Sequence, residues 1–119
     1  MLKQQTRLRV RLYARLSKDD GDADKESNSI KNQLQMLRYN AKEKGFIVVG
    51  EYVDDGYSGT TFNRPDLNRM IKDAMEDTEP SGIMVKDMSR FGRNNAMFMY
   101  YVEEIFPNND ILFIALNDD

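Results

Sequence analysis

The feature that most constrains the fold is the alternation of short apolar runs with stretches of helical spacing. Four runs have the alternating or β-branched character of strands, near residues 8–14, 46–53, 82–86 and 111–116. Between these runs, apolar residues recur three or four positions apart, as in helices that bury one face. The pattern predicts a three-layer α/β domain, with a mostly parallel sheet of four or five strands and helices on both faces.

Capping and breaking residues predict the helix boundaries. Ser27 or Asn28 is the expected cap of the first helix, which ends near Gly45. Pro65 suits the first position of the second helix, and the third spans 96–106 and ends at Pro107. The expected buried positions are Ile30, Leu34, Leu37 and Ala41 in the first helix, and Leu67, Met70, Ile71, Ala74 and Met75 in the second.

Composition excludes several classes of function. The 119 residues suit one domain, and the absence of cysteine and histidine excludes disulfides, thiolate chemistry, an imidazole base and the usual zinc site. The net charge of −3 excludes a basic nucleic-acid module by bulk charge. No apolar stretch approaches the roughly 20 residues that span a bilayer. We therefore expect a cytoplasmic protein without a membrane partner.

Three polar segments follow predicted strands, at 13–17, 54–65 and 86–94. Because ligands of parallel sheets bind beyond the carboxyl ends of the strands, these segments direct attention to one edge. Each also has a purely structural interpretation: a serine that caps a turn, a surface arginine at a helix start, and an arginine pair whose charge is offset by Asp87. Together the segments supply a hydroxyl, a lysine and the arginines Arg15, Arg64, Arg90 and Arg93. That set suits phosphoryl transfer at a diester, where cations stabilise charge on the phosphate oxygens.

The three motifs, Y-x-R-x-S, D-G-x-S-G-x-x-x-x-R-P and S-R-x-G-R-N, resemble those of the serine site-specific recombinases. The resemblance runs in order from about Leu8 to Leu116 and is closest to large serine recombinases and to the transposases and resolvases of mobile elements. It implies a resolvase-like fold in which Ser17 attacks a DNA phosphodiester, forms a 5′-phosphoserine link and frees a 3′-hydroxyl. Strand exchange and religation then need neither a metal nor another cofactor, nor ATP.

The resemblance also implies roles for other residues. Arg15, Arg64, Arg90 and Arg93 match phosphate-binding and transition-state arginines. Gln33 matches a glutamine that orders the site, and Lys86 falls where a basic residue is frequent.

Three departures from the family pattern stand out. Many small members have aspartate where this chain has Ser89, which weakens the assignment of a carboxylate as general acid for the leaving 3′-oxygen. Asp87 lies two residues earlier and is expected to point elsewhere in an extended segment. No general base for Ser17 is evident. Arg9 and Arg11 lie in a central strand, so we expect Arg11 to pair with an acid or one sheet face to be solvated.

Family members continue into a dimerisation helix and DNA-binding modules. We therefore expect residues 1–119 to be an isolated catalytic domain, inactive or weakly active alone. The DNA partner is expected to be bound mainly through the other modules, and the full-length protein is expected to associate into dimers or tetramers.

Two other functions fit parts of the sequence. A receiver-like phospho-acceptor domain would use Asp54 or Asp55 with Mg²⁺, Lys86, and the acids Asp19 and Asp20, but it leaves the arginines unexplained. A non-catalytic assembly module would use the Met-rich and aromatic segment 97–106 as a partner surface, although much of that stripe suits a core.

Overall fold

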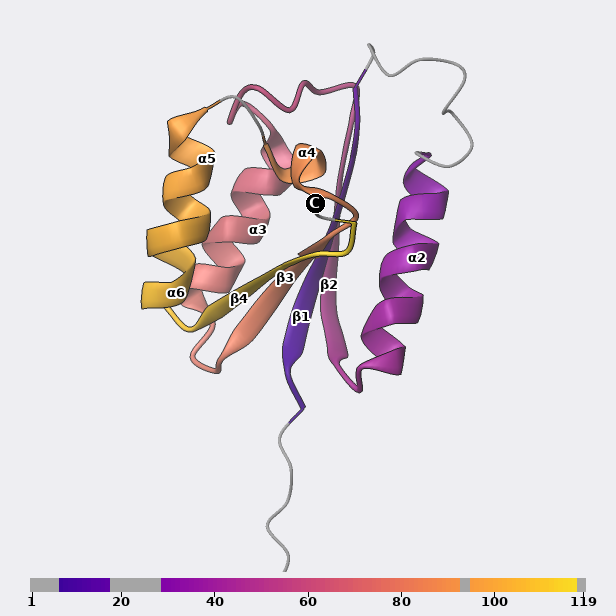
Figure 1. The fold of residues 1–119 in the computed structure, drawn as a ribbon, viewed down its shortest axis with the longest axis vertical. Coiled ribbons are helices and arrows are strands. Elements are labelled where there is room, and N and C mark those ends of the chain that lie inside the picture. Colours follow the sequence, from indigo (N-terminus) through magenta and orange to yellow (C-terminus); the bar gives the residue numbers. More distant parts are fainter. Residues whose placement is uncertain (1–6, 18–28, 93–94, 118–119) are drawn as a thin grey trace, which may run out of the picture.

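A four-stranded parallel sheet organises the chain, as the computed structural model shows for residues 7–17, 29–92 and 95–117 (Figure 1). The strands are β1 (Arg9–Leu16), β2 (Ile47–Asp55), β3 (Ser81–Val85) and β4 (Ile111–Ala115), in the order β2-β1-β3-β4. Each neighbouring pair is parallel. The second strand of the chain, β2, lies on one side of β1, and the third, β3, lies on the other side. The direction in which successive strands are added therefore reverses at β1.

Helices cover both faces of this sheet, which confirms the predicted architecture (Figure 1). The helix α2 (Ile30–Glu43) packs on one face. The other face carries α3 (Pro65–Glu76) and a helix built from α5 (Ala96–Tyr100), the π-helical η2 (Tyr101–Ile105) and α6 (Phe106–Asn108). A short helix, α4 (Met88–Phe91), follows β3.

The two faces have different cores. Beneath α2 the buried residues are aliphatic, with Leu34 and Leu37 packed against Val10 and Leu12 of β1. The opposite face is rich in aromatic rings, among them Phe91, Phe98 and Phe106. Close packing of these rings restricts their movement, and Phe91 at the end of α4 is one of them.

Three local predictions are wrong. The cap of α2 is Ser29, whose Oγ accepts the N–H of Asn32 at 3.1 Å; Ser27 and Asn28 lie outside the described residues. Met75 is 40% exposed because α3 turns that position away from the sheet. Pro107 does not end the third helix, which continues through it to Asn108. The π-helical turn before it widens the backbone, and a proline at the start of the next turn then needs no N–H partner.

The prediction that Arg11 pairs with an acid is confirmed. Its Nη2 lies 3.0 Å from Asp77 Oδ2, and Arg9 Nη2 lies 3.1 Å from the same oxygen. The guanidinium of Arg11 is buried on the α3 face, so this partner offsets the cost of placing a charge there.

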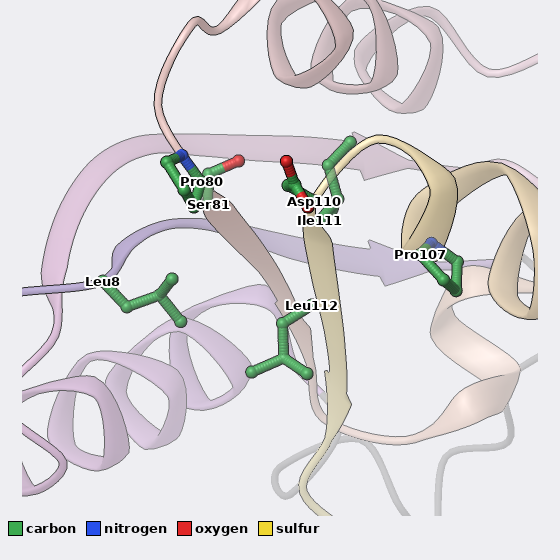
Figure 2. A pocket seen from close by; sticks show the side chains of 7 residues that line it. All are labelled: Leu8, Pro80, Ser81, Pro107, Asp110, Ile111 and Leu112. Atoms are coloured by element: carbon green, nitrogen blue, oxygen red, sulfur yellow. The ribbon is translucent and has the colours of Figure 1, made fainter.

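A hollow of about 310 Å³ opens at the amino ends of β3 and β4, beside Ser81 and Ile111 (Figure 2). Leu8, Leu112 and two prolines make its lining largely apolar. It lies at the opposite ends of the strands from the predicted motifs. Within the described residues, no helix is long and apolar enough to cross a membrane.

Candidate active site

Three segments that are far apart in sequence meet beyond the carboxyl ends of β1, β2 and β3. They contribute Arg15 from the end of β1, Arg64 from the start of α3, and Arg90 from α4. This position beside β1, where the strand order reverses, is where open parallel sheets bind ligands. The structure therefore brings three of the predicted arginines into one cluster.

Arg15 connects all three segments through backbone carbonyls. Its guanidinium donates from Nη1 to the Tyr57 carbonyl at 2.7 Å, from Nη2 to the Ser89 carbonyl at 2.9 Å and from Nε to the Arg90 carbonyl at 3.3 Å. The residue is 4% exposed, so these bonds form away from bulk water. Because β1 extends to Leu16, Arg15 belongs to the strand rather than to the loop that we expected after position 14.

Arg64 is fully buried, contrary to a surface position at a helix start. It donates to the carbonyls of Thr61 and Arg90 at 2.9 and 3.0 Å, and also to that of Phe91. Its guanidinium lies 5.2 Å from the centroid of the Phe98 ring. Burial lowers the pKa of Arg64 from its ordinary value, but hydrogen bonds and nearby negative charge still favour the cation.

Arg90 and Gln33 hold the end of β1. Arg90 Nη1 donates to the Arg15 carbonyl at 2.8 Å. The Gln33 amide accepts the Arg15 N–H at 3.1 Å and donates to the Arg15 carbonyl at 2.9 Å. Pairing between β1 and β3 stops at Tyr13, so the Gln33 side chain substitutes for the missing strand neighbour. Gln33 thus bonds both backbone groups of Arg15.

Sequence reasoning missed a buried link formed by Tyr13 and Asp54. The Tyr13 hydroxyl donates to Asp54 Oδ2 at 2.7 Å and accepts from Arg64 Nη1 at 3.3 Å. Burial raises the pKa of Tyr13, so its hydroxyl stays protonated and can donate. Asp54 also accepts the N–H groups of Asp66 and Leu67 at the start of α3. The signal was available, because Tyr13 begins the first motif and Asp54 directly precedes the second.

Glycines let the second segment approach the cluster. A Cβ at Gly59 would lie 2.8 Å from Arg15 Nη2 and 2.9 Å from the Ser89 carbonyl, too close for any other residue. Gly56 has φ +91°, a backbone conformation that residues other than glycine rarely adopt. Both positions therefore depend on glycine for a specific reason.

The remaining predicted residues lie at different places. Ser17 is half-buried and directly follows the last residue of β1. Lys86 is half-buried and follows β3, and its carbonyl accepts the Asn117 N–H at 2.8 Å. Arg93 lies outside the described residues. Of the residues predicted at this edge, the structure joins Arg15, Arg64 and Arg90 in one cluster, and Ser17 follows Arg15 by two residues.

The expectation that Asp87 points away from the site is wrong. Asp87 caps α4, so the chain turns at this point instead of remaining extended. Its Oδ1 accepts the Ser89 hydroxyl at 2.5 Å and the Arg90 N–H at 3.2 Å. The same oxygen lies 3.6 Å from Arg90 Nε. Asp87 and Ser89 therefore both belong to the arginine cluster.

The described residues do not favour the receiver-like alternative. Asp54 is buried, and its carboxylate oxygens are engaged by Tyr13 and by two backbone N–H groups. The described residues hold no group of three or more acidic or other metal-ligating side chains. Asp19 and Asp20 lie outside the described residues.

Comparisons with known proteins point to the same class. The fold matches the N-terminal catalytic domain of TP901-1 integrase with a TM-score of 0.77 and 30% identity, covering 92% of this chain and 77% of that one. The catalytic domain of ISC1926 TnpA, an IS607-like serine recombinase, matches with a TM-score of 0.74 and 25% identity, over 94% and 72% of the two chains. A resolvase family site-specific recombinase from Streptococcus pneumoniae matches with a TM-score of 0.71 and 28% identity, over 92% and 72%. A comparison with curated protein sequences gives no match.

These matches define the class as the catalytic domains of serine recombinases. Residues 10–119 match the family "Resolvase, N terminal domain". The chain belongs to the resolvase family, whose activity is site-specific recombination.

Proposed function

We propose that this chain breaks and rejoins DNA through a covalent 5′-phosphoserine intermediate formed by Ser17. The observation that carries the proposal is the convergence of Arg15, Arg64 and Arg90 beyond the end of β1. Ser17 follows Arg15 by two residues along the chain. The Ser17 oxygen attacks phosphorus and the 3′-oxygen leaves. The phosphodiester bond energy is kept in the new link, so religation needs no ATP.

The arginines act by stabilising charge. As the oxygen of Ser17 approaches phosphorus, negative charge grows on the phosphate oxygens, and preorganised guanidinium groups stabilise it. Arg15 and Arg64 donate to backbone carbonyls in this structure. Substrate binding then exchanges some carbonyl contacts of the cluster for phosphate oxygens, with Arg93 completing the set.

The partners of the proposed reaction are DNA and further copies of the protein. The acidic balance of the chain, 17 basic against 20 acidic residues, does not favour tight DNA binding by this domain alone. Additional DNA-binding modules and a dimerisation helix in the full-length protein supply target recognition and assembly.

The decisive experiment traps the covalent intermediate on labelled DNA carrying the target site of the full-length protein. Ser17→Ala removes the attacking oxygen, so the adduct that survives denaturation disappears. Ser81→Ala is the matched control, because Ser81 Oγ is buried without a hydrogen-bond partner at the far end of β3. An adduct of undiminished yield with Ser17→Ala, or a modified peptide elsewhere in the chain, refutes the assignment.

A further inference from the structure

Two carboxylates are bonded into the arginine cluster, and they differ in exposure and in partners. Asp54 is buried and accepts hydrogen bonds from Tyr13 and from two backbone N–H groups of α3. The side chain of Asp87 is 27% exposed. Asp54 therefore holds β1 and α3 together in the interior, whereas the Asp87 side chain is within reach of water, with which it can exchange a proton.

The Ser89 hydroxyl connects Asp87 to the cluster. Its proton is directed at Asp87 Oδ1, 2.5 Å away, so the lone pairs of its oxygen remain able to accept another proton. Arg90 Nη2 lies 3.4 Å from Ser89 Oγ. A hydroxyl placed between a carboxylate and a guanidinium can transfer a proton, because the cation stabilises the negative charge that develops on the oxygen.

We propose that Asp87 and Ser89 form a proton relay for the 3′-oxygen of DNA, an inference that rests on the proposed function. During cleavage, the bond from Ser17 Oγ to phosphorus forms and the bond from phosphorus to the 3′-oxygen breaks. The 3′-oxygen takes the hydroxyl proton of Ser89, which is replaced by the proton of a neutral Asp87 carboxyl group. Water supplies that carboxyl proton and accepts the proton that Ser17 loses.

Religation reverses each movement. The 3′-hydroxyl attacks the phosphoserine and gives its proton to Ser89 Oγ, while the Ser89 proton moves to the Asp87 carboxylate. The bond to Ser17 breaks, and its oxygen takes a proton from water. The hydrogen bond from Ser89 to Asp87 is the arrangement that this direction needs at its start.

Asp87→Asn separates the proton transfer from the structural role of the side chain. Asparagine caps helices as well as aspartate does, and its oxygen still accepts the Ser89 hydroxyl and the Arg90 N–H. It cannot take up or release a proton at neutral pH. Ser89→Ala removes the relay atom by an independent route and leaves the carboxylate in place.

The test compares two substrates in single-turnover cleavage by the full-length protein. One is ordinary DNA, and the other carries sulfur instead of the 3′-bridging oxygen at the scissile phosphate. A thiolate leaves without being protonated, so a relay matters only for the oxygen substrate. Both variants are expected to cleave ordinary DNA about 100-fold more slowly and the sulfur substrate at a rate within about threefold of the unsubstituted protein, given the usual size of general-acid effects.

Controls distinguish this inference from its alternatives. Asp110→Asn, at the far end of the sheet and at φ 58° where asparagine is well accommodated, is expected to leave both rates unchanged. The double variant Asp87→Asn with Ser89→Asp places a carboxyl group directly at the relay position and is expected to restore oxygen cleavage at least tenfold.

Equal losses on both substrates would mean that Asp87 only positions Arg90, and unchanged oxygen cleavage would mean that it has no part in the reaction. Either result overturns the relay while the Ser17 adduct still forms. Loss of that adduct from the unsubstituted protein overturns the proposed function itself.

Discussion

Replacing Tyr13 by phenylalanine tests whether the link between β1 and α3 holds Arg64 in place. The substitution removes one hydroxyl and leaves the ring in the core. The lost bonds are a 2.7 Å donation to Asp54 and a longer, 3.3 Å acceptance from Arg64. Hydrogen bonds to charged groups contribute about 1.5–3 kcal/mol, and both partners are charged.

The magnitude falls at the lower end of that range because neither partner is left without bonds. Asp54 keeps the N–H groups of Asp66 and Leu67, and Arg64 keeps the Arg90 carbonyl. We expect the free energy of unfolding to fall by about 2 kcal/mol. For a domain of this size, that corresponds to a decrease in Tm of about 8 °C.

The assay is urea unfolding followed by circular dichroism, with Tyr39→Phe as the matched control. Tyr39 is 64% exposed on α2, so its hydroxyl is expected to contribute less than about 0.5 kcal/mol. A double-mutant cycle of Tyr13→Phe with Asp54→Asn isolates the coupling, expected at about 1 kcal/mol or more. A loss below about 0.5 kcal/mol for Tyr13→Phe, or additive effects in the cycle, would refute the reasoning.

Three further predictions concern other parts of the structure. Gly92→Ala places a Cβ against the ring of Phe98, so we expect a loss of about 1–3 kcal/mol in thermal unfolding; an unchanged Tm would show that the ring can move. Gln33→Met removes the hydrogen bonds that Gln33 makes with the Arg15 N–H and carbonyl and is expected to cost about 2 kcal/mol by the same measurement, whereas a neutral effect would mean that other groups take its place. The pKa of Asp77 is lowered, first by the backbone N–H of Glu79 and then by its arginine partners, so the stability it contributes is complete above the ordinary aspartate value of 3.8 and is lost as the pH falls through the lower folded-state pKa. Asp77→Asn should flatten that acid limb of the stability profile, and an unaltered limb would assign it to other carboxylates.

Much of the fold could be predicted because its signals are local. The β-branched and aromatic run at 46–53 indicates a strand whatever surrounds it, and Pro65 indicates a helix start. The parallel arrangement follows from the alternation of strands and helices. Boundaries were less accurate where the decisive partner is distant. β1 extends to Leu16 because β2 pairs with it as far as Asp55, and no local pattern shows that pairing.

Helix ends show the same division between local and distant causes. A proline indicates a helix end when only its missing N–H is considered. In the third helix the π-helical turn before Pro107 removes that conflict. Tyr101 begins this turn and Phe106 follows it, and both rings pack in the aromatic core with centroids 5.7 Å apart.

The sequence by itself determined the layered α/β class, the order of the elements and which three segments carry polar chemistry, because apolar periodicity and strand order are properties of the chain alone. Only the tertiary structure decided how those segments meet. Arg64 is buried among aromatic rings instead of exposed, and its guanidinium donates to the carbonyls of Arg90 and Phe91 in a distant segment. The physical reason is that a buried guanidinium or carboxylate is stable only where distant backbone groups satisfy its hydrogen bonds, and those groups become neighbours only when the sheet is assembled.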